Sequence, residues 1–410
     1  MDNLFGFLLA VQKSNGGGGG GGIDITGATE ISAKAISNLS SNETVLITKA
    51  NQTIPFSSSD LPGSAYGCAW SSDGTRLAIA HAASPYVTIY DTTTTPYTKL
   101  ANPSTLPNGT CYSCAWSPDG TKLVIGSVGS LMVIIYDTTT TPYTRLTNLG
   151  VSIASAPYGC AFSPDGTRLA FAVKSSPYIV IYDTTTTPYT QLSAPDTKPT
   201  GQCNGCAWSP DGKYLAVAHN VSPYITVYDT TTTPYTKLAN PGTLPANIGQ
   251  SCAWNNTGTR LAVAHNGSPY ITIYDTSTTP YTKLTNPSTL PNANGYDCAF
   301  SPDGTQLIVV YAANLGLKRY DTSTTPYSEL SAFNPLPYIG TWGKCNFSND
   351  GKRLCVSYTT TPYVFVYNMG TTELFKANND VPNYYGGGYG YAKTSIASGS
   401  TGTAVVLFEP

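Results

Sequence analysis

The sequence predicts an all-β protein assembled from repeated four-stranded antiparallel sheets, and three observations support this fold class. The motif Cys-Ala-Trp-Ser-Pro-Asp-Gly at 206–212 returns along most of the chain, and a fixed period of this kind is typical of a repeat architecture. Tyr, Thr, Pro and Gly are abundant, and these residues favour strands and tight turns over helices. Each period also contains four short strand patterns, which is the pattern of a β-propeller blade.

The period is read from the cysteine that opens the motif. Successive cysteines are 46 residues apart five times and then 47 residues apart. They are Cys68, Cys114, Cys160, Cys206, Cys252, Cys298 and Cys345.

One period shows how a blade is expected to form. Residues 206–208 predict a first strand, and Ser-Pro-Asp-Gly at 209–212 predicts a turn. Residues 214–218 are apolar on both faces and predict a second strand that is buried on both sides. Residues 224–228 alternate as a third strand, and 235–238 form a short fourth strand.

The number of blades depends on the two ends of the chain. Seven cysteine openings indicate seven blades, but Tyr389-Gly-Tyr-Ala392 echoes Tyr66-Gly-Cys-Ala69 one period after Cys345. Outer strands near Val45 and Ile54 would then pair with inner strands near Ala392 and Val406 and close the ring, which removes exposed sheet edges. We therefore expect eight blades, with seven blades plus a terminal extension as the alternative.

The repeat resembles a known family. Ser-Pro-Asp-Gly-Thr-Arg-Leu-Ala at 163–170, followed by Tyr182-Asp183, is similar to the opening strands and closing Trp-Asp of a WD-repeat blade. Tyr replaces Trp in that dipeptide, and the Gly-His pair of the family is missing. The longer phrase at 209–229 and its copies resembles propeller repeats of bacteriophage and prophage tail or fibre proteins, over about residues 60–370. That resemblance implies a virion protein.

The chain is expected to have three parts: 1–22, 23–42 as a connecting segment, and the propeller at 43–410. The first part combines an apolar segment with an unbroken glycine run at 16–22, which is a flexible linker. This pattern favours a docking peptide that anchors the protein in a virion, although a signal peptide is an alternative. The expected anchoring residues are Leu4, Phe5, Phe7, Leu8 and Leu9.

Composition argues against two classes of partner. Charged residues make up only 11% of the chain and the formal net charge is −2, so the basic surface of a nucleic-acid-binding protein is not expected. No apolar run reaches the roughly 18 residues that span a bilayer.

The ten cysteines favour burial over chemistry. Seven share one repeat position, and equivalent positions in successive blades are expected to lie too far apart for disulfides. Two CxxC pairs, Cys111/Cys114 and Cys203/Cys206, leave zinc or redox chemistry as an alternative. Because the pairs are two repeats apart and lack a nearby histidine, we expect no metal and no cofactor.

The other conspicuous polar residues also follow the repeat. His81, His219 and His265 each lie thirteen residues after their cysteine, so they are expected to be polar residues of blade loops. The aspartates of the Asp-Gly turns are expected to bond backbone donors, and no catalytic constellation stands out. We predict a protein that is not an enzyme, with a propeller hydrolase or lactonase as the less favoured alternative.

The strand order separates two rims, which we name by their connections. The turn rim carries the Ser-Pro-Asp-Gly and Asp-Thr-Thr-Thr-Thr-Pro turns, and the loop rim carries the His-Asn-Val-Ser-Pro-Tyr loops and the links between blades. Aromatic and amide groups on the loop rim predict contacts with a glycan or a partner, although packing between blades is the alternative reading of the tyrosines. The candidate residues are Tyr86, Tyr178, Tyr224, Tyr270, Tyr363, His81, His219, His265, Asn220 and Asn266.

Some blades break the symmetry of this rim. Gly129-Ser-Leu-Met132 replaces the Ser-Pro-Tyr loop, and residues 314–319 and 335–342 also depart from the repeat. These loops are where an asymmetric partner is expected to dock. The favoured function is a structural phage virion protein, present in multiple copies and located at the particle surface. It would contact other virion proteins through its N-terminus and host glycans or neighbouring subunits through its rim. The alternative is a WD-repeat-type protein-interaction scaffold.

Overall fold

The computed structural model describes residues 61–312, 316–331, 333 and 342–369, together with the backbone of six further strands. The chain divides into two compact units, which are described separately below. One unit is Phe56–Val366, and the other combines Met1–Pro55 with Tyr367–Pro410. No helix among the described residues has the length and apolar character needed to cross a membrane.

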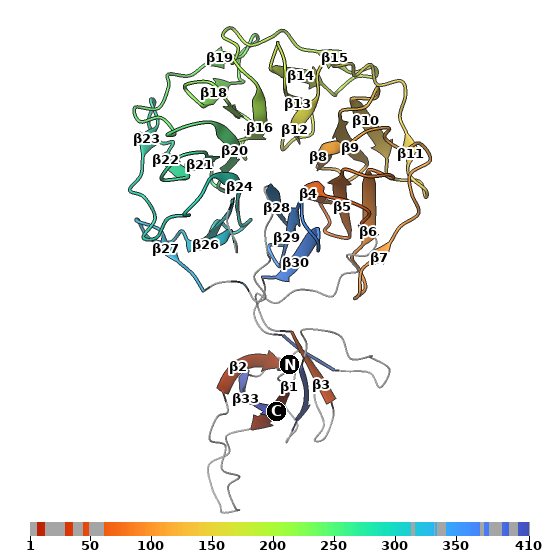
Figure 1. The fold of residues 1–410 in the computed structure, drawn as a ribbon, viewed down its shortest axis with the longest axis vertical. Helices are drawn as coiled ribbons and strands as arrows, with labels where there is room; N and C mark the ends of the chain where they lie inside the picture. Colours follow the sequence, from red (N-terminus) through yellow and green to blue (C-terminus); the bar gives the residue numbers. More distant parts are fainter. Residues whose placement is uncertain are drawn as a thin grey trace, which may run out of the picture. The chain divides into compact units, whose positions relative to one another are not determined.

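The larger unit is a β-propeller with seven antiparallel blades arranged around a central axis (Figure 1). Six blades have four strands, and the seventh has three among the described residues. The inner strands are β4 (Ala65–Trp70), β8 (Cys111–Trp116), β12 (Pro157–Phe162), β16 (Cys203–Trp208), β20 (Gly249–Trp254), β24 (Gly295–Phe300) and β28 (Gly343–Phe347). The second strands are β5 (Arg76–His81), β9 (Lys122–Ser127), β13 (Arg168–Val173), β17 (Tyr214–His219), β21 (Arg260–His265), β25 (Gln306–Tyr311) and β29 (Arg353–Tyr358).

The outer half of each blade follows the same order. The third strands are β6 (Val87–Asp91), β10 (Val133–Asp137), β14 (Ile179–Asp183), β18 (Ile225–Asp229), β22 (Ile271–Asp275), β26 (Leu317–Asp321) and β30 (Val364–Asn368). The short outer strands are β7 (Thr98–Lys99), β11 (Thr144–Arg145), β15 (Thr190–Gln191), β19 (Thr236–Lys237), β23 (Thr282–Lys283) and β27 (Ser328–Glu329). The four strands predicted from one period are therefore confirmed.

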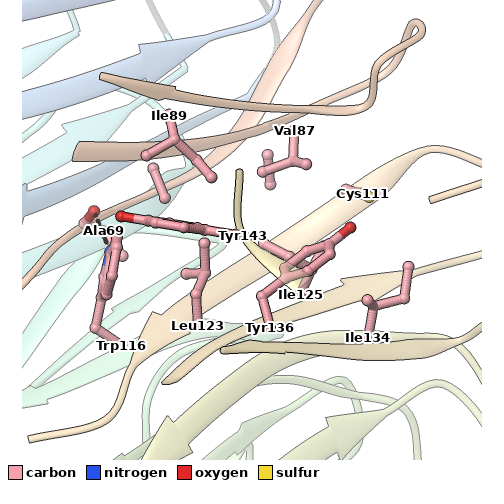
Figure 2. Close-up of a cluster of buried hydrophobic side chains, with 12 residues drawn as sticks. Ala69, Val87, Ile89, Cys111, Trp116, Leu123, Ile125, Ile134, Tyr136 and Tyr143 are labelled. Carbon is pink, nitrogen blue, oxygen red and sulfur yellow. Dashed lines mark hydrogen bonds between the residues drawn. The ribbon is translucent and has the colours of Figure 1, made fainter. Parts of the chain in front are cut away.

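The second strands are the most deeply buried elements. In β17 every residue after Tyr214 is buried, because Leu215, Val217 and their alternating neighbours pack toward blades on opposite sides. Figure 2 shows the equivalent core between the first two blades, where Trp116 and Tyr143 meet edge to face with ring centroids 6.1 Å apart. Each aliphatic side chain buried in this way contributes about 1.5–3 kcal/mol to folding, so stability rests on the contacts between blades.

The expectation of eight blades is wrong, and the seven-blade alternative fits the structure. Strand β3 (Thr44–Thr48) pairs with β31 (Glu373–Lys376) and β32 (Gly388–Ala392). Strand β33 (Thr401–Glu409) pairs with β1 (Gly6–Gln12) and β2 (Thr29–Ala35). These strands form a closed six-stranded barrel in the smaller unit, so those near Val45, Ala392 and Val406 build no blade. Ile54 lies outside the described residues.

The propeller ring closes directly between its seventh and first blades. The Trp70 backbone N–H donates to Asn346 Oδ1, and the Trp70 indole donates to the Asn346 carbonyl, each at 3.1 Å. The Arg353 guanidinium lies 4.5 Å from the Trp70 ring and donates to the Gly74 carbonyl at 2.8 Å. A cation above an indole face is attracted by the ring quadrupole. These contacts join the two ends of the ring without an eighth blade.

Candidate functional site

The predicted separation into two rims is confirmed by the strand registers. In blade 4, Cys203 pairs with His219 at the loop rim, and Trp208 pairs with Leu215 next to the Asp-Gly turn. The two rims therefore present different sets of side chains, some of which are engaged in the scaffold.

The turn rim is held by a repeated hydrogen-bond pattern. In blade 4, the Ser209 hydroxyl donates to Asp211 Oδ1 at 2.6 Å, and the Lys213 backbone N–H donates to the same oxygen at 3.1 Å. Gly212 has a φ of 71°, a left-handed conformation that glycine adopts without a steric penalty. Burial acts to raise the pKa of Asp211, but the hydrogen bonds from Ser209 and Lys213 outweigh it and the pKa is lowered. The carboxylates of this rim are thus occupied by turn formation.

The three predicted histidines are engaged in the scaffold as well. His81, His219 and His265 are 0% exposed, and each Nε2 lies 2.9–3.0 Å from a threonine hydroxyl on the neighbouring strand. Burial lowers the pKa of His81 and of His219 to about 4, and it also lowers that of His265. They are separate from one another in different blades, and an external ligand cannot reach them in the folded protein.

The tyrosines of the outer loops are partly buried. Tyr86, Tyr178, Tyr224 and Tyr270 all have a φ of 67°, and in each case the backbone N–H closes a turn, as from Tyr224 to the Val221 carbonyl. Tyr86 and Tyr178 pack against the cores between blades. Tyr363, also partly exposed, accepts a bond from the Tyr358 backbone. The structure therefore places the five predicted tyrosines apart from one another, each in a different blade.

The two predicted asparagines differ in their surroundings. Asn220 is exposed, and its backbone N–H donates to the Gln202 carbonyl at 3.0 Å. Asn266 is partly buried and accepts a bond from Gln250 Nε2 at 3.3 Å. Asn266 thereby connects its outer loop to the inner strand of the same blade. The expected anchoring residues Leu4 and Phe5 lie outside the described residues, and for Phe7, Leu8 and Leu9 only the backbone of β1 is described.

The cysteines of the repeat serve the contacts between blades. The Cys252 thiol donates to the Ala216 carbonyl of the preceding blade at 3.6 Å, and Cys114 and Cys298 make the same bond at 3.7 Å. Burial raises the pKa of Cys160 and Cys206 to about 12. Because the thiolate is the reactive form, these thiols stay protonated and unreactive near neutral pH, even though Cys160 and Cys206 are only partly buried. Every cysteine is free within the described residues, and no group of three or more His, Cys, Asp or Glu side chains there has a metal-binding arrangement.

A cavity of about 360 Å³ lies among the seven inner strands of the propeller. Every inner strand contributes to its lining. The residues include Gly67, Tyr112, Tyr158, Asn204, Ser251, Asp297 and Lys344. A volume in the range of about 300–1,000 Å³ with convergent polar groups is typical of small-molecule sites.

Residues that sequence reasoning missed lie at the loop-rim end of the inner strands, and three of them, Tyr112, Tyr158 and Asn204, line this cavity. In six blades the register between the inner and second strands shifts by one residue, as between Cys203 and Gly205. The residue left unpaired by each bulge is Tyr66, Tyr112, Tyr158, Asn204, Gln250 or Tyr296. We call these six residues and Trp342 the channel mouth. Each bulge residue lies two positions before the repeated cysteine, a signal that alignment of the repeats would have shown.

The aromatic side chains of the channel mouth contact one another between blades. The ring centroids of Tyr66 and Tyr112 are 5.0 Å apart, and those of Tyr112 and Tyr158 are 4.8 Å apart. Tyr296 and Trp342 stack with an interplanar angle of 12° and centroids 5.4 Å apart. Asn204 and Gln250 separate these two aromatic arcs, so the channel mouth is asymmetric.

One charged pair lies next to the Tyr296–Trp342 stack. Asp297 is only 5% exposed, and its Oδ1 lies 3.5 Å from Lys344 Nζ. Its Oδ2 accepts the Cys345 backbone N–H at 2.7 Å. The equivalent position is glycine or serine in the first five blades, so the charge of the channel wall is confined to the last two blades.

Comparisons with known proteins agree with this architecture. The profile of the family "Eukaryotic translation initiation factor eIF2A" matches residues 20–184, less than half of the chain. A comparison with curated proteins found no match.

Three solved structures share the fold. A chain of Kuenenia stuttgartiensis hydrazine synthase is 19% identical, with a TM-score of 0.59, and the match covers 75% of this chain and 96% of that one. A chain of the mitotic checkpoint complex is 17% identical, with a TM-score of 0.59 and coverage of 73% and 88%. The β-propeller domain of Myceliophteria thermophila Cps50 (Swd1) is 16% identical, with a TM-score of 0.59 and coverage of 75% and 98%. At these identities the likeness shows the fold alone. The chain has a WD-repeat-like β-propeller.

Proposed function

We propose that this propeller is a non-enzymatic protein-interaction scaffold that binds a partner across its loop rim. The observation that carries the proposal is that the blades differ from one another mainly on this rim. Six blades share the Ser–Asp hydrogen bond of the turn rim, whereas the loop rim changes its side chains from blade to blade. An asymmetric partner needs such differences to select one orientation on a ring of similar blades.

The loops of blades 2 and 4 supply apolar contact points on the rim. Val128 is 43% exposed and Val221 is 41% exposed, and they are the large apolar side chains most open to solvent within the described residues. Both follow the end of a second strand in equivalent loops. In blade 2, Asn108 Nδ2 donates to Ser130 Oγ at 2.5 Å, which fixes a loop shape that the Ser-Pro-Tyr loops do not share. Exposed apolar residues with polar surroundings suit a transient protein interface.

The state of the titratable groups supports the non-enzymatic part of the proposal. General bases work best when their pKa lies near the operating pH. Burial instead holds His81 and His219 neutral, and burial raises the pKa of Cys160 and Cys206 to about 12. These groups therefore serve as scaffold in the described part of the chain.

The comparisons favour the scaffold over the virion protein. Among the structures that share the fold, one chain belongs to the mitotic checkpoint complex, an assembly by its printed name. The partial match to eIF2A adds a second likeness outside phage proteins. The virion location and N-terminal anchoring, expected from the resemblance of the repeat, have no support in these comparisons and stay predictions.

An exchange of loops tests the proposal. Residues 128–132, Val-Gly-Ser-Leu-Met, would be replaced by Asn-Val-Ser-Pro-Tyr, the residues of the equally long loop at 220–224. The exchange removes the distinct shape of blade 2 and leaves the repeat intact, so folding is expected to persist. Quantitative affinity purification from the native cells should then lose the principal partner. The control changes Thr140, Thr186 and Thr232 on the turn rim to serine and should retain it; equal retention by the loop exchange would argue against the loop rim.

A further inference from the structure

The channel mouth has the features of a built ligand site, separate from the outer loops to which a protein partner is assigned. Six β-bulges lie at the loop-rim end of the inner strands, and the bulge residues Tyr112, Tyr158 and Asn204 line the central cavity. Bulges redirect side chains and are over-represented next to functional sites. The bulged position holds Tyr, Asn or Gln, whereas the cysteine two residues later is the same in all these blades. The backbone is thus uniform while the chemistry presented at the mouth varies.

One buried polar group of the mouth lacks a hydrogen-bond partner. Gln250 is 7% exposed; its Nε2 donates to Asn266, and its Oε1 has no hydrogen-bond partner among the described residues. A buried carbonyl without a partner costs stability of about 1–3 kcal/mol, so this position is not optimised for stability. Asn204 is 6% exposed, and its side-chain amide donates to the backbone carbonyl of Gly249 at 2.8 Å. This bond holds the Asn204 side chain in place. Ser113 and Ser251 add hydroxyl groups to the cavity wall.

The charge and shape of the cavity narrow the class of ligand. The only charged side chains that line it within the described residues are Asp297 and Lys344, which form a pair at 3.5 Å and cancel in net charge. A neutral ligand therefore fits better than an anion or a cation. The polar lining offers both donors and acceptors, and Tyr112 and Tyr158 add aromatic surface to the same wall. A ligand that carries hydroxyl groups and an apolar C–H face on one small ring matches this combination of polar and aromatic groups.

We propose that the channel mouth binds the terminal sugar of a neutral glycan. The rings of Tyr112 and Tyr158, which line the cavity, contact the apolar face of the sugar ring. Ser251 and the Asp297–Lys344 pair, which line the same cavity, bond its hydroxyls. The ligand enters end-on, because the site is surrounded by the inner strands. This site is distinct from the protein-binding loops, so either assignment can fail without the other.

Calorimetric titration of the full chain with neutral disaccharides tests the proposal. The probes are maltose, cellobiose, lactose and N,N′-diacetylchitobiose. At least one is expected to bind. The double variant Tyr112→Asn/Tyr158→Asn gives two bulges the residue type of Asn204 and should weaken binding by about tenfold or more, from the loss of two aromatic contacts. Ser251→Gly gives blade 5 the glycine that blades 1, 3 and 4 hold at the equivalent position and should weaken the same titration.

The matched control makes the same chemical change on the outer loops. Tyr178→Asn/Tyr224→Asn keeps residues that tolerate a positive φ and should leave saccharide binding unchanged. Thermal unfolding of each variant establishes that the propeller is folded. Loss of binding only in the outer-loop variant would overturn the assignment to the channel mouth. Absence of binding between the wild-type chain and all four probes would also overturn the assignment. So would a peptide that binds this mouth when the saccharides do not.

Discussion

The turn rim and the loop rim come from the same repeat, yet the blades vary far more on one than on the other. Blade 5 lacks the serine of the turn rim but keeps side-chain hydrogen bonds in its turn. There the Asn255 side chain accepts the Arg260 backbone N–H at 3.0 Å and donates to the Thr257 hydroxyl at 2.9 Å. On the loop rim, by contrast, the residue after the bulge of the inner strand ranges from glycine to Asp297.

The physical reason for the difference lies in what each rim demands of its side chains. A tight turn needs a glycine with positive φ and a short acceptor that bonds the backbone, so few residue types are compatible. A bulge needs only an unpaired backbone residue, and its side chain projects away from the ladder. The loop rim can therefore diversify under weaker constraints from folding. This freedom supports the proposal that recognition takes place on the loop rim.

The largest expected effect concerns the buried histidines behind the loop rim, which should make the propeller sensitive to acid. Above pH 6.5 both the folded and the unfolded states carry neutral histidines, so these groups contribute no pH dependence. Below it the unfolded chain binds protons, whereas folded His81 and His219 stay neutral until about pH 4. The free energy of unfolding should therefore fall by about 3 kcal/mol for each of these two histidines between pH 6.5 and 4. Urea unfolding across this pH range measures the slope.

A matched variant separates the contribution of one histidine to the pH dependence of unfolding from the contribution of the acidic groups. Blade 3 holds Val173 and Val180 where blade 4 holds His219 and Thr226. The double variant His219→Val/Thr226→Val transfers that apolar pair to blade 4. It should reduce the pH dependence of unfolding between pH 6.5 and 4, and an unchanged slope would show that the histidine is not the titrating group.

A smaller effect is expected on the turn rim. Asp211→Ala removes the acceptor for the Ser209 hydroxyl and the Lys213 backbone N–H, so unfolding free energy should fall by about 1–2 kcal/mol in chemical denaturation. The double variant Ser209→Asn/Asp211→Thr installs the turn chemistry of Asn255 and Thr257 and should recover most of that loss. If the double variant is no more stable than Asp211→Ala, side-chain bonding does not hold this rim together.

The smallest effect on stability is expected where recognition is assigned. Val221→Ser changes an exposed loop residue, so the free energy of unfolding should change by no more than about 0.5 kcal/mol. The same substitution should weaken partner binding measured by affinity purification. A large drop in stability would instead assign Val221 to the scaffold and remove it from the recognition surface.

The strands and turns of a blade were predictable because they depend on local sequence. Alternating apolar residues at 224–228 and the Ser-Pro-Asp-Gly turn at 209–212 each specify their own conformation. The shared position of the repeated cysteines predicted burial, which is confirmed for Cys68, Cys252, Cys298 and Cys345, whereas Cys114, Cys160 and Cys206 are only partly buried. Their bonds to the preceding blade, such as Cys252 to the Ala216 carbonyl, depend on how neighbouring blades are placed and were not predictable from the repeat.

The blade count failed at the ends of the chain because strand pairing is not a local property. Tyr389-Gly-Tyr-Ala392 fits an inner strand by its letters, but its backbone pairs with β1 and β3. Short alternating segments fit many partners, and only the whole fold selects one. The channel mouth was missed for a related reason: a bulge residue such as Asn204 is unremarkable in sequence, and its place beside the axis follows from a shift in register.

Photo-crosslinking from paired positions on one blade tests the central claim most directly. A benzophenone amino acid would be placed at Val221 on the loop rim or at Thr232 on the turn rim; both residues are exposed and belong to blade 4. In the native cells we expect a discrete crosslinked protein from position 221, and a molar excess of the unlabelled propeller should abolish it. We expect no such product from position 232. A competed product from position 232 alone would contradict the assignment of recognition to the loop rim.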